Sequence, residues 1–178
     1  MNLVLFATAA ALLSLERICY ILISRAPDAF RAWCAHPFVA QLGTPVDVVR
    51  ALFLSFKALQ GAVFFAWCYV HSQGTLLPLA ASPWALATGA LLIASGQFLS
   101  TSVFYQLGYV GVFYGARLGH TVPWCTSFPF AYLSHPQYVG TVLSIWGLFL
   151  IVRFPNADWM ALPLLETVYY WLGARLES

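Results

Sequence analysis

The chain has 178 residues, of which 61% are hydrophobic and only 8% are charged. Soluble domains carry about 25% charged residues, so this chain has too little charge to cover the surface of a soluble protein of its size. Its net charge of +2 is too small to indicate a nucleic-acid partner. The four cysteines lack the spacing of metal-binding motifs, so we expect no metal site.

Apolar runs of about 20 residues recur along the chain, and a helix of that length crosses a bilayer core about 30 Å thick. We therefore predict an all-α, polytopic integral membrane protein with four to five transmembrane helices in one domain, residues 1–178. The last two apolar segments are short for full spans, so a tilted hairpin and one broken element both remain open. The expected segments are 2–24, 51–71, 84–105, 137–152 and 158–173.

Two long connections separate these segments. Residues 25–50 contain three prolines; we predict a short interfacial helix near residues 30–33, and a helix start with Thr44 as N-cap and Pro45 at the first position. Residues 106–134 form a long connection that is rich in glycine. A turn is expected at residues 153–156.

The arginines predict the orientation of the chain. Arg25, Arg31 and Arg50 lie in the first connection and Arg117 lies in the third, whereas the second connection has no lysine or arginine. Because positive residues concentrate in cytoplasmic loops, we expect the first and third connections in the cytoplasm and the N-terminus outside. Arg153 falls on the opposite side and does not fit this orientation.

Three charged residues lie inside apolar segments. A charge within the bilayer is costly, so we expect Arg17 and Lys57 to extend toward the interface and Glu16 to bond to another helix. Adjacent residues point in different directions on a helix, so Glu16 and Arg17 need not pair with each other. Glu16 and Lys57 are outside candidates for contact with a lipid headgroup.

The second half of the third segment, residues 94–102, is small and polar. Gly96 and its neighbours predict either close helix packing or the wall of a cavity for a polar ligand, and Gln97 favours the cavity. Gly108 and Gly111 in the next connection likewise suggest either a closely approached backbone or a packing face. Arg117 beside them is a candidate for binding a carboxylate or phosphate.

The stretch FPFAYLSHPQYVG, residues 128–140, links two apolar segments. A residue that precedes proline is disfavoured in helices, and proline is tolerated in a first helical turn, so a helix is predicted to begin at Pro136. His135, Gln137 and Tyr138 then lie at a helix N-terminus, where N–H groups are free. A proline-capped helix with a polar first turn at the lipid interface is the alternative.

These motifs resemble those of a known family. LGYVGVFYG, FPF and HPQYVG, followed by a glutamate after the last apolar stretch, are similar to the membrane phospholipid N-methyltransferases and, more distantly, the isoprenylcysteine carboxyl methyltransferases. The resemblance covers roughly residues 94–178, the expected cofactor half. It implies methyl transfer from S-adenosylmethionine to the amine of a phospholipid headgroup, phosphatidylethanolamine or its methylated forms, at the cytoplasmic membrane face. Carboxyl methylation of a prenylated cysteine or another membrane-bound acceptor, and a non-catalytic membrane scaffold, remain as alternatives.

The resemblance implies roles for individual residues of this sequence. The family's Pro-x-Tyr-x-Gly element is present as Pro136, Tyr138 and Gly140. Only Gly96 remains of a short Gly-x-Gly cofactor motif. Relatives often end with two glutamates that bind the cofactor, whereas this chain has Glu177 alone. A cofactor site built from these residues requires the chain end and residues 128–140 to meet at one water–lipid boundary.

The chemistry suggests roles for the site residues. The nucleophile is a neutral amine, and histidine titrates near neutral pH, so His135 is the candidate base, with cofactor binding and helix capping as alternatives. Tyr138, Tyr105 or Tyr114 can place a ring near the sulfonium. The expected location is the inner membrane in a bacterium and the endoplasmic reticulum in a eukaryote. The expected catalytic residues are His135 and Tyr138, and the expected cofactor-binding residues are Gly96, Gln97, Gly108, Gly111, Arg117, His135, Pro136, Gln137, Tyr138, Gly140 and Glu177.

Overall fold

The computed structural model describes residues 2–72, 81–123, 125–152 and 157–177. These residues form helices and irregular segments, with no strand among them, which confirms the all-α prediction. The turn expected at residues 153–156 lies outside the described residues, as does most of the connection between the second and third segments. The helices are α1 (Leu3–Arg25), α2 (Pro27–Cys34), α3 (Pro37–Ala40), α4 (Pro45–His71), α5 (Pro83–Val112), α6 (Pro136–Ile151), the 3₁₀ helix η1 (Ala157–Met160) and α7 (Ala161–Leu176).

Local sequence sets where most helices begin. Each of α2 to α6 starts at a proline, whose missing N–H costs nothing in a first turn. At α4 the hydroxyl of Thr44 accepts from the N–H of Asp47, and the Asp47 carboxylate accepts from the N–H of Thr44 at 2.9 Å, forming a capping box. The predicted starts at Pro45 and Pro136, and the short helix near residues 30–33, are confirmed.

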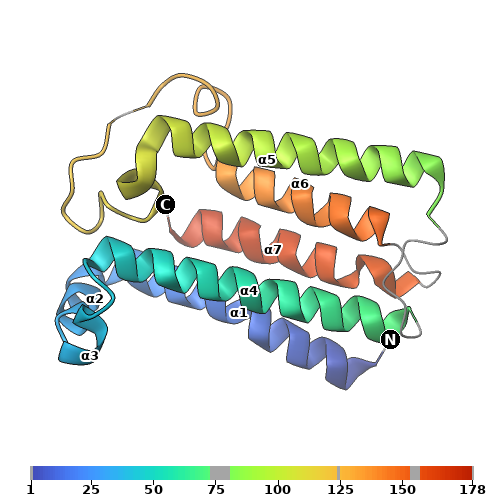
Figure 1. Ribbon diagram of the computed structural model, residues 1–178, viewed down its shortest axis with the longest axis horizontal. Helices are drawn as coiled ribbons and strands as arrows, with labels where there is room; N and C mark the ends of the chain where they lie inside the picture. The colour runs from blue at the N-terminus through green and yellow to red at the C-terminus, as the bar shows by residue number, and fades with distance from the viewer. Residues whose placement is uncertain (1, 73–80, 124, 153–156, 178) are drawn as a thin grey trace.

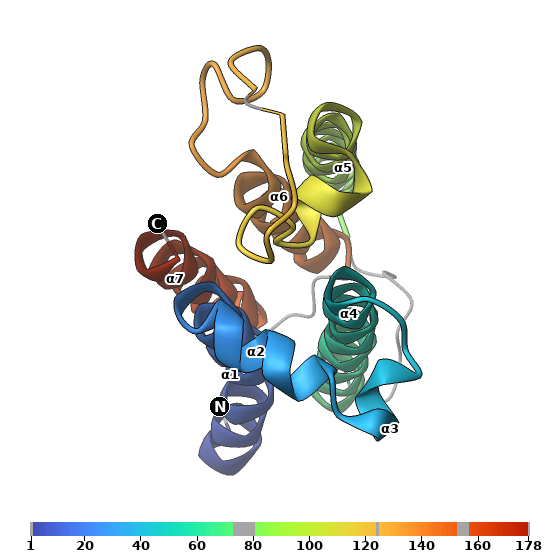
Figure 2. The same ribbon diagram turned by 90° about the vertical axis from the view of Figure 1, so that its left-hand side faces the viewer.

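The five long helices lie side by side and alternate in direction, so the N-terminus and the chain end lie at opposite ends of the bundle (Figure 1). Three of the described helices, α1, α4 and α5, are long and apolar enough to cross a membrane. The shorter α6 and α7 run along the same axis as an antiparallel pair. Viewed from the end that carries α2 and α3, α5 and α6 form one group and α1, α4 and α7 the other (Figure 2).

Exposed positive charge gathers at one end of this bundle, here called the α2 end. It carries the end of α1, the start of α4, the end of α5 and the end of α7 (Figure 1). Arg153, which did not fit the expected orientation, is not among the described residues. Every exposed arginine in the described ranges lies at this end: Arg25, Arg31, Arg50, Arg117 and Arg175.

Helix α5 is longer than predicted. We expected it to end near residue 105, where the glycine-rich connection was predicted to begin, but the helix continues to Val112. Gly108 interrupts it with φ 64° and ψ 179°, a conformation that is essentially restricted to glycine. The helix continues beyond this kink because Val110 and Val112 pack against the buried cluster around Phe113. The glycines therefore mark a bend in the helix and not its end.

Glycines also allow α5 and α6 to pack closely. A Cβ atom added to Gly96 would lie 2.3 Å from the carbonyl oxygen of Gly140, and one added to Gly140 would lie 2.6 Å from the carbonyl oxygen of Gly96. Gly89 and Gly147 face each other in the same way. Of the two interpretations of residues 94–102, the structure supports helix packing at Gly96.

We predict that Gly96→Ala destabilises the protein. Overpacking typically costs about 1–3 kcal/mol, and here the added methyl group meets backbone of α6. The control is Gly61→Ala in α4, where an added Cβ atom meets nothing within 4 Å. Alanine in this helix should raise the free energy of unfolding by about 0.5–1 kcal/mol. The measurement is the free energy of unfolding of each variant in mixed micelles, compared with that of the wild type. A Gly96→Ala variant at least as stable as Gly61→Ala would contradict this packing.

Candidate functional site

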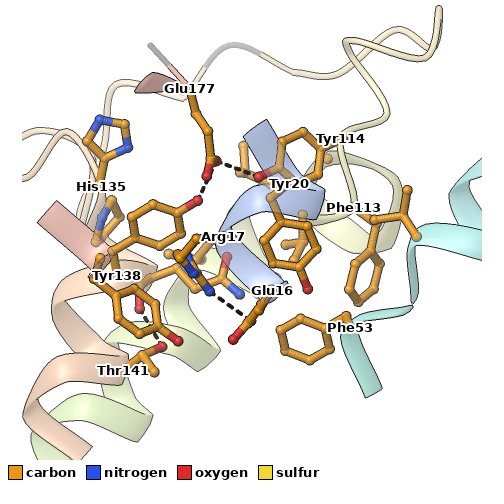
Figure 3. Close-up of a pocket in the computed structure, with 18 of the residues that line it drawn as sticks. Glu16, Arg17, Tyr20, Phe53, Phe113, Tyr114, His135, Tyr138, Thr141 and Glu177 are labelled. Atoms are coloured by element: carbon orange, nitrogen blue, oxygen red, sulfur yellow. Dashed lines mark hydrogen bonds and ion pairs between the residues drawn. The ribbon is translucent and has the colours of Figure 1, made fainter. Parts of the chain in front are cut away.

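A cavity of about 220 Å³ lies toward the α2 end of the bundle. All five long helices and the segment between α5 and α6 contribute to its wall. It separates the buried cluster around Trp67 and Phe149 from the cluster around Val49 and Phe113. Its polar lining consists of Glu16, Arg17, Tyr20, Lys57, Tyr114, Ser134, His135, Gln137, Tyr138, Thr141, Tyr170 and Glu177, most of which are drawn in Figure 3.

Glu177 joins the end of α7 to the start of α6. Its Oε2 atom accepts hydrogen bonds from the hydroxyls of Tyr138 and Tyr114, as Figure 3 shows. Arg117 Nη2 donates to the backbone oxygen of Glu177 at 3.2 Å. The other carboxylate oxygen of Glu177, Oε1, is buried without a hydrogen-bond partner. The chain end and residues 128–140 therefore meet at one place, as the sequence predicts.

Tyr114 is held for this contact by an unusual backbone. Its φ of 59° lies in the left-handed region, which bulky residues rarely adopt. The ring packs against Tyr20, with 5.7 Å between centroids. Burial raises the pKa of the Tyr114 hydroxyl far above its ordinary value, and Tyr138 and Glu177 raise it further. The hydroxyl therefore stays protonated and remains a donor to the Glu177 carboxylate.

Arg17 is buried at the cavity wall and does not extend to the interface, so that prediction is wrong. The residue is 5% exposed, and its guanidinium lies 4.1 Å from the ring centroid of Tyr170 and 5.3 Å from those of Tyr20 and Tyr138. Its Nη2 atom lies 2.8 Å from Glu16 Oε1, so the two neighbours do pair. The tyrosine rings and Glu16 lie closer to the Arg17 guanidinium than the end of α1, which is about 12 Å along the helix from Arg17.

Lys57 also stays inside the bundle, contrary to prediction. Its Nζ atom lies 3.0 Å from Glu16 Oε1 and donates to the hydroxyl of Tyr170 at 2.8 Å and to Gln60 Oε1 at 3.2 Å. Gln60 in turn donates to the buried Glu166 at 2.7 Å. The expected bond from Glu16 to another helix is confirmed. Charges within apolar segments were the available signal for this network.

Part of the predicted site set reaches the cavity. His135 stands at the N-cap position of α6 but its side chain makes no capping hydrogen bond, so the capping alternative is not observed. Its ring stacks on Tyr138, with 5.7 Å between centroids and 17° between planes. The predicted residues that line the cavity are Gly111, His135, Pro136, Gln137, Tyr138 and Glu177.

The other predicted residues do not line the cavity. Gln97 donates to Ser144 Oγ at 3.1 Å, on the α5–α6 side. Tyr105 is 88% exposed on the outside of α5, which removes it as a ring near the ligand. Arg117 reaches Glu177 only through the backbone oxygen. The predicted cofactor-binding residues outside the lining are Gly96, Gln97, Gly108, Arg117 and Gly140.

The lining combines two carboxylates, a guanidinium, an ammonium and four tyrosine rings. Such a set suits a ligand that carries both positive and negative charge, because rings and carboxylates attract cations and guanidinium binds anions. Among the described residues, no group of three or more His, Cys, Asp or Glu side chains could hold a metal ion. The side chains of the lining can bind and orient such a ligand and exchange protons with it.

Comparisons with known proteins agree with the motifs. Residues 84–178 match the family model described as phospholipid methyltransferase. A phosphatidyl-N-methylethanolamine N-methyltransferase from Arabidopsis thaliana is 48% identical over 54 residues, which cover 30% of this chain and 33% of that protein. No solved structure matches the chain. Because the family model covers more than half of it, the chain belongs to the phospholipid methyltransferase family.

Proposed function

We propose that this protein transfers a methyl group from S-adenosylmethionine to the amine of a phospholipid headgroup, phosphatidylethanolamine or one of its methylated forms. The observation that carries the proposal is the meeting of Tyr138 and Glu177 in one cavity within the family-matched region. The name of the plant relative supports a lipid amine as the acceptor.

The residues of the cavity fit this cofactor. S-adenosylmethionine, when bound, supplies a methyl group on a positively charged sulfur. Tyr138 and Tyr114 offer rings for a cation, and the unpartnered Oε1 of Glu177 can accept from an amino or hydroxyl group. Pro136 and Gln137 complete the wall beside Tyr138. These residues would hold the two reactants in line, which is the main contribution an enzyme makes to a direct displacement.

The chain must also keep the acceptor amine neutral. A lipid ammonium resembles lysine, with a pKa near 10, so the neutral form costs about 4 kcal/mol at pH 7. Entry into the cavity removes part of the water around the ammonium, and this loss of hydration disfavours the charged form. His135 lines the cavity and is the side chain we assign to accept the amine proton. Tyr138, stacked on it, would orient the imidazole ring.

The distribution of arginine supports a cytoplasmic position for this site. The cavity lies toward the α2 end, where all exposed arginines of the described residues are found. Positive residues mark cytoplasmic ends of membrane helices. The water-soluble cofactor would enter from that side and the lipid from the bilayer. The membrane would be the inner membrane in a bacterium and the endoplasmic reticulum in a eukaryote.

We expect the purified protein in nanodiscs to methylate lipid amines when it is given S-adenosylmethionine with a labelled methyl group. The acceptors to compare are phosphatidylethanolamine, its mono- and dimethyl forms, and a prenylated cysteine. Mass spectrometry should detect methylated amine lipids. A methyl ester of the prenylated cysteine as the sole product would establish the carboxyl methyltransferase alternative, and absence of cofactor binding would favour the scaffold.

Glu177→Gln and Tyr138→Ala should weaken cofactor binding by about tenfold or more, because the first removes a charged acceptor whose hydrogen bond is worth about 1.5–3 kcal/mol and the second removes the ring offered to the sulfonium. Calorimetry with S-adenosylmethionine measures the Kd of each variant. The matched controls are Asp28→Asn and Tyr132→Ala, which change exposed side chains outside the cavity lining. Unchanged affinity in both site variants would remove Glu177 and Tyr138 from the cofactor site.

His135→Gln should lower the methylation rate at pH 7 by about 10²–10⁴-fold, the usual contribution of a general base. The neutral fraction of the lipid amine rises about tenfold per pH unit below its pKa, so the rate of the variant should recover as pH rises from 7 to 9. The exposed His120→Gln is the control. If the variant and wild type have parallel pH profiles, His135 is not the base.

A further inference from the structure

Arg17 presents two unsatisfied donors at the cavity. Its Nε and Nη1 atoms are buried and have no hydrogen-bond partner, and the residue is 5% exposed. Buried polar groups in proteins are almost always hydrogen-bonded, because an unsatisfied one costs about 1–3 kcal/mol. The surrounding tyrosine rings contact the guanidinium through their faces and do not replace acceptors for these N–H groups.

Arg17 shares its ion-pair partner with a second cation. Glu16 is the only acidic residue in ion-pair contact with both Arg17 and Lys57 among the described side chains, at 2.8 and 3.0 Å. Glu166, the next buried carboxylate in the described part of the chain, accepts from Gln60 and forms no ion pair with Arg17, so it does not supply acceptors for the free Arg17 N–H groups. Glu177, the other carboxylate at the cavity, accepts its hydrogen bonds from Tyr114 and Tyr138.

The two unpartnered groups of opposite charge lie close together beside Gly173, and both residues line the cavity. A Cβ atom added to Gly173 would lie 3.3 Å from Glu177 Oε1 and 3.7 Å from Arg17 Nη1. Figure 3 shows the Arg17 guanidinium between Glu16 and the ring of Tyr138, on the Glu177 side of the cavity. A ligand that reaches this region would meet a free carboxylate oxygen and a free guanidinium edge together.

We propose that Arg17 binds the anionic oxygen group of a ligand in this cavity, either a carboxylate or a phosphate. Guanidinium presents its N–H groups as a planar fork that suits both. The inference rests on the proposed function, under which the carboxylate belongs to the amino-acid end of the cofactor and the phosphate to the lipid headgroup. Arg17 lies on α1, outside the family-matched residues 84–178.

The test compares Arg17→Gln and Arg17→Lys with Arg31→Gln, which removes an exposed arginine outside the cavity. Calorimetry in nanodiscs measures binding of S-adenosylhomocysteine, which has the carboxylate, and of methylthioadenosine, which lacks it. If Arg17 binds the carboxylate, Arg17→Gln should weaken the binding of S-adenosylhomocysteine by about 10–100-fold and leave the affinity for methylthioadenosine unchanged. Arg17→Lys keeps the charge but loses the fork and should show a smaller loss.

A lipid measurement distinguishes the other source. Native mass spectrometry compares retention of phosphatidyl-N-methylethanolamine with retention of diacylglycerol, which has no phosphate. If Arg17 binds the phosphate, Arg17→Gln should lose the preference for the phospholipid while both nucleosides bind normally. Arg17 variants that match Arg31→Gln in both measurements would overturn the proposal. Should Arg17→Gln fail to fold, Arg17→Lys decides on the same criteria.

The outcomes also separate this proposal from the function on which it rests. Wild-type protein that binds neither nucleoside would contradict the proposed methyltransferase function. The lipid measurement would then decide the Arg17 proposal by itself, because loss of the phospholipid preference supports a phosphate site and an unchanged preference rejects it.

Discussion

Buried charge in an apolar bundle needs a partner, and in this protein the partners come from different helices. Glu16 of α1 contacts Lys57 of α4, and Gln60 of α4 donates to Glu166 of α7. Glu177, just after α7, accepts from Tyr138 of α6. Each contact satisfies a group that would be costly to leave alone in low dielectric, and together they connect four helices around one cavity. The polar network therefore links the helices that form the cavity wall.

The packing of α5 against α6 places the motif within this network. Gly140 touches the backbone of α5 at Gly96, so α6 approaches α5 more closely than a side chain would allow. Tyr138 lies two residues before Gly140 and so points in a different direction, toward Glu177. Each residue of the Pro-x-Tyr-x-Gly element therefore has a separate role. The proline starts helix α6, the glycine lets α6 pack against the backbone of α5, and the tyrosine faces the cavity.

Local signals in the sequence were sufficient for much of this fold. The starts at Pro45 and Pro136 follow from residues within one turn, and the meeting of Glu177 with Tyr138 followed from the family motif. Burial of Arg17 could not be predicted, because extension to the interface and burial differ only in which side chains other helices present. Gly96 was ambiguous for a related reason: a small residue permits approach by a helix or by a ligand, and the sequence does not name which.

The cavity is a composite of both halves of the chain. The family model covers residues 84–178, yet Arg17, Tyr20 and Lys57 of α1 and α4 complete the wall that Tyr138 and Glu177 begin. Removing α1 would expose the ring of Tyr170 and leave Lys57 without Glu16. An unpaired ammonium in an apolar environment is strongly unfavourable, so α4 depends on α1 for the charge balance of this region. Tyr138 and Glu177 come from the motif-bearing half, and Glu16 and Arg17 of the first half complete the buried polar cluster beside them.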